Sequence, residues 1–151
     1  MIRSSGFLFL LSIVCAPAAQ PGGQAIYVGG TLPAFTSGLK GTVQTAIPDA
    51  FVFATHTSTL RVPYEKITSV EYGQEANRRV LLAFAISPVF LLLKARGHFI
   101  TLHFTGESGK HEVVVLRIDK RLIRAELATL EAKTGRAVEY QDADARRSRR
   151  S

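Results

Sequence analysis

Histidines are the side chains of this sequence with the widest chemical range, since an imidazole can bind a metal ion or transfer a proton near neutral pH. A glycine-containing turn over residues 106–109 would place two of them close together on adjacent strands. With a nearby glutamate, such a pair could begin a metal site. The side chains concerned are His103, His111, Glu107 and Glu112, and the other two histidines are His56 and His98.

The spacing of these residues argues against a metal site. Residues 111 and 112 face opposite sides of a strand, so only one of them can share a face with His103. No third ligand follows from the spacing. We therefore expect no metal, and we expect His98, which shares its face with Ile100 and Leu102, to be partly buried and hydrogen-bonded.

Catalytic motifs are also missing from the sequence. The carboxylates of Glu65 and Glu71 lie six residues apart across a corner, and nothing fixes the separation that would decide their chemistry. There is no G-x-S-x-G motif, no P-loop and no dinucleotide fingerprint. We expect a non-enzymatic protein without catalytic residues or cofactors. A metal-dependent or hydrolytic enzyme is the remote alternative.

The first 19 residues have the pattern of a secretory signal peptide. Arg3 supplies a positive charge, residues 7–15 form an apolar run, and Ala16-Pro17-Ala18 resembles an A-x-A cleavage site. Cleavage near Ala18 or Ala19 would export the protein to the periplasm or the extracellular space. Retention as an anchor and lipidation at Cys15, the single cysteine, remain open alternatives.

The net charge of +7 is distributed unevenly. Arg3 leaves with the signal, and residues 141–151 carry a net charge of +2, so residues 19–140 carry only +4. This mild excess predicts no nucleic-acid partner. We expect the tail to be disordered. It could touch anionic lipid or remain solvated, and its cations are Arg146, Arg147, Arg149 and Arg150.

Alternating apolar and polar residues predict strands in much of the remaining chain. The predicted strands are 39–45, 50–55, 59–62, 67–72, 98–105 and 111–118. Residues 20–37 are rich in glycine and proline, and we expect them to form a flexible leader arm. Its apolar patch at 25–28 is expected to pair with the domain edge. Asp119 is expected to cap a helix that ends at Gly135, with a brief return to the sheet at 137–140.

Residues 80–93 form an apolar run interrupted only by Ser87 and Pro88. We expect a helix over 75–87 and a buried strand over 89–93. As one helix the run would rise about 21 Å, which is too short for a hydrocarbon core of about 30 Å. It is either part of the core or a membrane-surface element. The contacts of the second case would be Arg78, Arg79, Phe84, Phe90, Lys94 and Arg96.

The order of these elements predicts a mainly β (α+β) fold over residues 38–140: an antiparallel split barrel of about seven strands capped by one C-terminal α-helix. The stretch from Leu60 to Glu71, with its V-P-Y-x-K-I-x-S-V-E pattern, resembles the first half of bacterial pleckstrin-homology-like (PH-like) and GRAM-like domains. The resemblance extends over about residues 38–135. It implies a bent split barrel that binds a lipid, a peptide or another protein.

Phosphoinositide-binding members of this family carry a basic loop between their first two strands. We assign that loop to residues 45–49, which contain no lysine or arginine, and therefore expect no phosphoinositide binding. The function predicted from the sequence is an exported, non-enzymatic binding module for a protein segment or a lipid surface. The alternative is a peripheral membrane protein that uses residues 80–93 and the basic tail.

Overall fold

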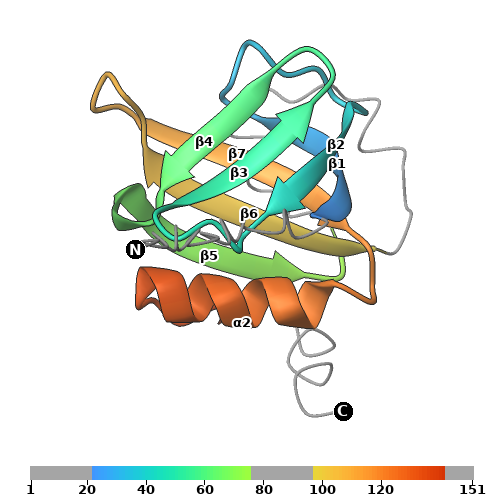
Figure 1. Ribbon diagram of the computed structural model, residues 1–151, viewed down its shortest axis with the longest axis vertical. Coiled ribbons are helices and arrows are strands. Elements are labelled where there is room, and N and C mark those ends of the chain that lie inside the picture. Colours follow the sequence, from blue (N-terminus) through green and yellow to red (C-terminus); the bar gives the residue numbers. More distant parts are fainter. Residues whose placement is uncertain (1–21, 76–96, 142–151) are drawn as a thin grey trace, which may run out of the picture.

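The computed structural model describes residues 22–75 and 97–141, which form a single eight-stranded sheet and one α-helix (Figure 1). The strands are β1 (Gly23–Gly30), β2 (Lys40–Gln44), β3 (Ala50–Thr55), β4 (Thr59–Pro63), β5 (Ile67–Gly73), β6 (His98–Thr105), β7 (His111–Ile118) and β8 (Glu139–Tyr140). The helix is α2 (Ile123–Thr134), and a short 3-10 helix, η1 (Tyr64–Lys66), joins β4 to β5.

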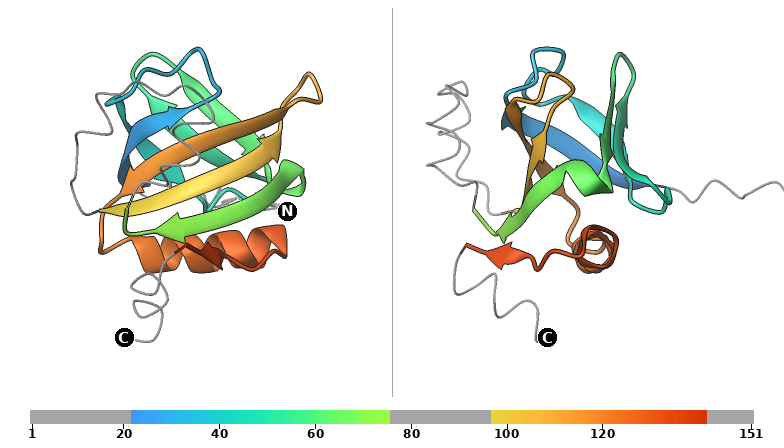
Figure 2. Two further views of the ribbon diagram at one scale, coloured as in Figure 1. Left: turned by 180° about the vertical axis from the view of Figure 1, so that it is seen from behind. Right: turned by 90° about the vertical axis from the view of Figure 1, so that its left-hand side faces the viewer.

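The strand order across the sheet is β4-β3-β2-β1-β7-β6-β5-β8. Every neighbouring pair is antiparallel except β5 and β8, which run parallel. The sheet bends, so that β1–β4 and β5–β7 face each other across the core (Figure 2). In the described residues the sheet stays open between its edge strands β4 and β8. The mainly-β prediction with one helix is therefore confirmed, whereas the described sheet has eight strands instead of seven and does not close into a barrel.

The core lies between the two halves of the sheet and α2. Inward residues of all seven longer strands join one apolar cluster with Ile123, Leu127 and Leu130 of the helix. Helix α2 runs below β5 and packs its apolar side upward into this cluster (Figure 1). A helix at this place removes the apolar interior of the bent sheet from water, which is the main stabilising contribution to such a fold.

Strand β1 corrects the prediction of a flexible leader arm. It lies in the middle of the sheet, where it pairs with β2 on one side and β7 on the other. Its glycines serve close packing, because a Cβ atom at Gly30 would collide with the carbonyl oxygen of Val113. Gly30 also has a φ of 155°, which side-chain-bearing residues rarely adopt. Tyr27, only 2% exposed, fixes the strand to the core.

The helix begins later than predicted. The carbonyl of Asp119 accepts hydrogen bonds from the backbone N–H groups of Leu122 and Ile123, so a separate turn precedes α2. The Asp119 carboxylate accepts from the N–H of Arg121 within this turn and does not cap the helix. The predicted end is confirmed, since Gly135 has a φ of 66° and its N–H donates to the carbonyl of Glu131.

Several predictions lie outside the described residues. They are the signal peptide, most of the helix over 75–87, the strand over 89–93, the apolar run 80–93 and nearly all of the tail. Among the helices that the structure does describe, none combines the length and the apolar character needed to cross a membrane.

Candidate functional site

The predicted membrane or partner contacts are not among the described residues. All ten fall in 76–96 or 142–151: Arg78, Arg79, Phe84, Phe90, Lys94, Arg96, Arg146, Arg147, Arg149 and Arg150. The candidate site must therefore be built from other side chains.

The turn between β6 and β7 brings two histidines together, as the sequence predicted. Nδ1 of His103 lies 3.3 Å from Nε2 of His111, and the two rings stack with their centroids 5.2 Å apart. A carboxylate oxygen of Glu71, on β5, lies 2.9 Å from Nε2 of His103. That nitrogen is buried without a directed hydrogen bond, so its contact with the carboxylate is an electrostatic one.

This row of side chains does not assemble a metal centre. In residues 22–75 and 97–141 no three histidine, cysteine, aspartate or glutamate side chains are placed to hold a metal ion together. Glu71 instead accepts a hydrogen bond from the side-chain amide of Gln141, and Ser69 donates one to Glu139. These contacts tie β8 to β5, and the arrangement therefore fits a structural role at the sheet edge. Glu65, the other predicted carboxylate, lies in η1.

A second polar group is buried beneath the helix. The hydroxyl of Thr45 donates to the carboxylate of Glu126 over 2.7 Å, and the hydroxyl of Tyr64 donates to the carbonyl of Thr45. Burial raises the pKa of Glu126, and the hydrogen bond from Thr45 partly opposes this rise. Burial, with the charges of Glu126 and Asp49, raises the pKa of Tyr64 to about 12. The hydrogen bonds from Thr45 and Tyr64 join α2 to the sheet, and none of these three residues lines the groove described next.

Described residues from six chain segments line an open groove of about 820 Å³. The register of the sheet explains its charge. Ile26 of β1 pairs with Lys40 of β2 on one side and with Arg117 of β7 on the other. Neighbouring paired residues have Cα atoms about 5 Å apart, so the two cations flank Ile26 closely. Lys120, just after β7, adds a third cation to the lining.

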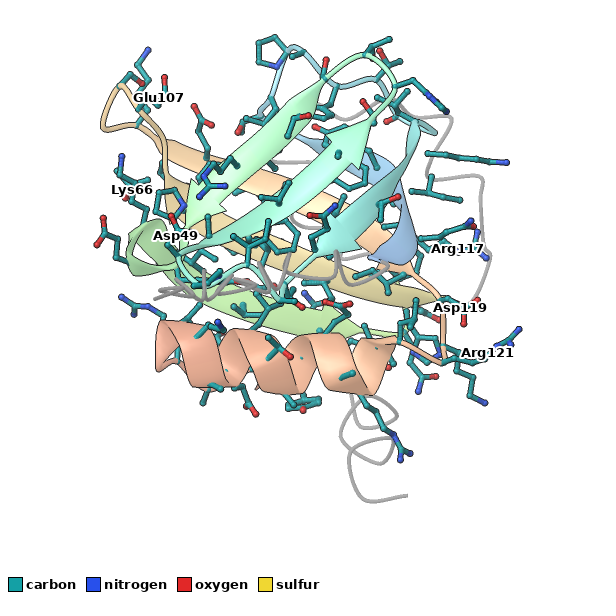
Figure 3. The ribbon with its side chains drawn as sticks, in the orientation of Figure 1. Asp49, Lys66, Glu107, Arg117, Asp119 and Arg121 are labelled. Atoms are coloured by element: carbon teal, nitrogen blue, oxygen red, sulfur yellow. The ribbon has the colours of Figure 1, made fainter. Side chains whose placement is uncertain are left out.

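Carboxylates do not neutralise these cations. Within the described ranges, no carboxylate lies at ion-pair distance from Lys40, Arg117 or Lys120. Asp119 also lines the groove, but its carboxylate is engaged by Arg121, through the backbone N–H at 2.8 Å and the guanidinium at 3.8 Å. Figure 3 shows Arg117, Asp119 and Arg121 together at the end of β7. The groove therefore presents an excess of positive charge to solvent.

Two histidine side chains also line the groove. His56 comes from the turn between β3 and β4, and His98 begins β6. Nδ1 of His98 lies 2.6 Å from the hydroxyl of Tyr72, which confirms the predicted hydrogen-bonded, partly buried histidine. Burial, and then the charge of Lys120, lower the pKa of His98, while Asp119 acts in the opposite direction. Burial therefore favours the neutral form of His98, and the permanent positive charges that line the groove are those of Lys40, Arg117 and Lys120.

The loop between the first two strands differs from the one assigned from the sequence. Because β1 precedes the strand that was taken as the first, this loop is 31–39 instead of 45–49. It too contains no lysine or arginine. That the chain binds no phosphoinositide stays a prediction, which now refers to residues 31–39.

Sequence reasoning missed the groove. Its three cations are spaced far apart in the chain, and each alone resembles an ordinary surface charge. The signal that could have revealed them is the strand at 25–28, because placing it in the centre of the sheet aligns Lys40 with Arg117.

No protein-family model matches this chain, and no match to it was found among curated proteins. The functional reasoning therefore rests on the geometry above.

Proposed function

We propose that this chain is an exported, non-enzymatic binding module of the PH-like or GRAM-like class, and that its groove receives an acidic segment of a partner protein. The observation that carries the proposal is the pairing of Lys40 and Arg117 on either side of Ile26, with Lys120 beside them and no carboxylate of the described chain paired to any of the three. Unpaired cations in a groove attract and orient a negatively charged partner.

The strand order supports the class assignment. Four consecutive antiparallel strands, β1–β4, form one half of the sheet, and β5–β7 form the other, with a single helix packed against the core between them. We interpret this bent sheet as the split barrel that the V-P-Y-x-K-I-x-S-V-E resemblance implies.

The shape and chemistry of the groove favour an extended peptide over a small phosphorylated ligand. The cations lie along a surface built from several strands, and they do not converge in one loop. Polar side chains beside them, those of Gln24 and Thr42, are of a type that forms hydrogen bonds with a peptide backbone. An acidic peptide would match both the charge and the length of this surface.

The proposal can be tested with the mature chain and a fluorescent oligoglutamate peptide. The groove variant carries Lys40→Glu and Arg117→Glu. The matched control carries Arg124→Glu and Arg136→Glu, which make the same charge change at exposed positions away from the groove. We expect the groove variant to weaken binding about tenfold or more, which corresponds to 1.4 kcal/mol or more. The control should change the affinity far less.

Each result separates the candidate partners. Equal losses in both variants would show a response to net charge alone and would overturn the groove assignment. Binding to vesicles containing phosphatidylglycerol, without binding to the peptide, would favour a lipid surface as the partner. An absence of binding to either probe at low salt would contradict the proposal, because electrostatic attraction is strongest there.

A further inference from the structure

Ile26 differs from the other apolar residues that line the groove. Ala25 and Ile118 are also part of the lining, but both are buried and belong to the core cluster. Ile26 is partly exposed and is not among the residues that pack in or against that cluster. Successive side chains of a strand alternate between its two faces, so Ile26 points to the outer face of the sheet. It gives the groove an apolar contact that the packing of the core does not use.

The register of the sheet places Ile26 between two cations. Lys40 pairs with it from β2, and Arg117 pairs with it from β7. Directly paired residues of neighbouring strands point to the same side of a sheet, so the three side chains form a row on the outer face. Paired Cα atoms lie about 5 Å apart, and the row therefore spans about 10 Å. A ligand that contacts both cations must pass over Ile26.

Arg117 has a defined place at its end of the row. A Cβ atom added to Gly97 would lie 3.0 Å from Nε of Arg117 and 3.2 Å from the ring of Phe99. The arginine side chain thus lies close against the backbone of Gly97, whose N–H donates to the carbonyl of Gln74 over 3.1 Å. The missing side chain at residue 97 leaves room for this cation at the border of the groove.

Positive charge by itself gives a groove little selectivity. Coulombic attraction acts over long distances and draws any anionic segment toward the surface. An apolar contact acts only at short range, and its contribution depends on how much apolar surface the ligand covers. The aliphatic stems of lysine and arginine side chains can add to such a contact on either side. A ligand side chain lying on Ile26 would therefore distinguish one acidic sequence from another.

We propose that Ile26 is a specificity-determining residue of the groove, and that the partner segment carries an aliphatic side chain with a carboxylate on each side of it. This inference rests on the proposed function. The carboxylates pair with Lys40 and Arg117, and the aliphatic side chain lies on Ile26. An extended peptide advances about 3.3 Å per residue, so a motif of about four residues covers the row.

Three fluorescent peptides of equal charge test the proposal with the full mature chain. The first has a leucine at the centre of four glutamates, the second has a serine at that position, and the third has the leucine at one end. We expect the first peptide to bind about tenfold more tightly than the second, because the serine loses the apolar contact. It should also bind more tightly than the third, in which carboxylates do not flank the leucine.

A matched pair of variants assigns this preference to one residue. Ile26→Thr keeps the β-branched shape that suits a strand and removes part of the apolar surface. The control is Ile47→Thr, at a partly exposed isoleucine that neither lines the groove nor packs against the core cluster. Ile26→Thr should lose most of the preference for leucine and keep its affinity for the serine peptide. Ile47→Thr should change neither.

The salt dependence separates the apolar contact from the charges. Raising the salt concentration should weaken the binding of all three peptides, because ions screen the attraction between opposite charges. The ratio of affinities between the leucine and serine peptides should stay within about twofold, since burial of apolar surface is not screened. A preference that disappears at high salt would contradict the role of Ile26.

The outcomes distinguish this inference from the proposed function. Equal binding of the three peptides, with binding lost when Lys40 and Arg117 are both replaced by glutamate, would overturn the role of Ile26 and leave the proposed function standing. An undiminished preference in Ile26→Thr would also overturn that role. An absence of binding to every peptide at low salt would contradict both proposals. Tighter binding to phosphatidylglycerol vesicles than to any peptide, weakened by Ile26→Thr, would assign the groove to a lipid surface instead.

Discussion

The two faces of strands β6 and β7 differ in where their packing partners come from. The inner face packs against residues from every longer strand and from α2, all of which the structure describes. The outer face holds four further buried side chains that lie outside this cluster, those of Phe99, Thr101, Val113 and Val115. Because both faces of the pair carry buried apolar side chains, substitutions on the two faces can be compared directly.

The polar groups sharpen the same comparison. On the inner side, Glu126 is buried and accepts a hydrogen bond from Thr45. On the outer side, the mostly buried side chains of Glu71 and His103 lie in contact, with 18% and 15% of their surface exposed. Substitutions on each side should differ in size and in their response to pH.

The largest effect is expected from Leu102→Ala on the inner face. Leu102 is 0% exposed and lies within the core cluster. Removing its side chain should lower the free energy of unfolding by about 3 kcal/mol, through lost burial and the cavity left behind. Denaturant titration followed by circular dichroism measures this change. A loss below about 1 kcal/mol would show that the inner face is loosely packed.

Val115→Ala tests the outer face in the same way. The substitution removes two methyl groups from a side chain that is 1% exposed, and about 0.8 kcal/mol per buried carbon predicts a loss of about 1.6 kcal/mol. The same titration measures it. If the outer face were open to solvent, the loss would stay within about 0.5 kcal/mol, as for most surface substitutions, and the two faces would no longer be comparable.

Glu126→Gln should act in the opposite direction and by a smaller amount. The pKa of Glu126 is raised by burial, so the folded state favours the protonated carboxyl, and its contribution to stability is lost as the pH rises through the folded pKa. At neutral pH the neutral amide should therefore raise the thermal midpoint. Below 4.5, the ordinary pKa of a glutamate, the parent carboxyl becomes protonated in both states, and the difference should vanish. A variant that is less stable than the parent at neutral pH would contradict this.

The smallest effect is expected from Glu71→Gln in β5. The carboxylate is partly exposed, with its side chain at 18%, and the amide can still accept hydrogen bonds. We expect a loss below about 1 kcal/mol that shrinks further in high salt. Thermal melts at low and high salt measure it. A loss as large as that of Leu102→Ala would mean that the contacts of Glu71 stabilise the outer face more than its buried apolar side chains do.

The strands around the hairpin turns could be predicted closely from the sequence. Strands 50–55, 98–105 and 111–118 have the boundaries that alternation and turn glycines predicted. The closeness of His103 and His111 followed from the same turn. Local signals sufficed here, because hairpin partners are neighbours in the chain.

Other features depended on distant contacts and could not be predicted. Strand β1 was mistaken for an arm because its glycines suggest flexibility when read alone, yet here they allow close approach to β7. The groove was missed with it, since the alignment of Lys40 with Arg117 exists only once β1 separates them.

The sequence by itself determined the predominance of strands, the hairpins and the helix end at Gly135, because these follow from side-chain periodicity and backbone freedom over a few residues. The tertiary structure decided the central place of β1, the charge of the groove and the hydrogen bond that joins Glu126 of the helix to Thr45. Each of these depends on which strands become neighbours and which face is covered. Those choices are set by burial of apolar surface between segments that are far apart in the chain, and local patterns do not encode them.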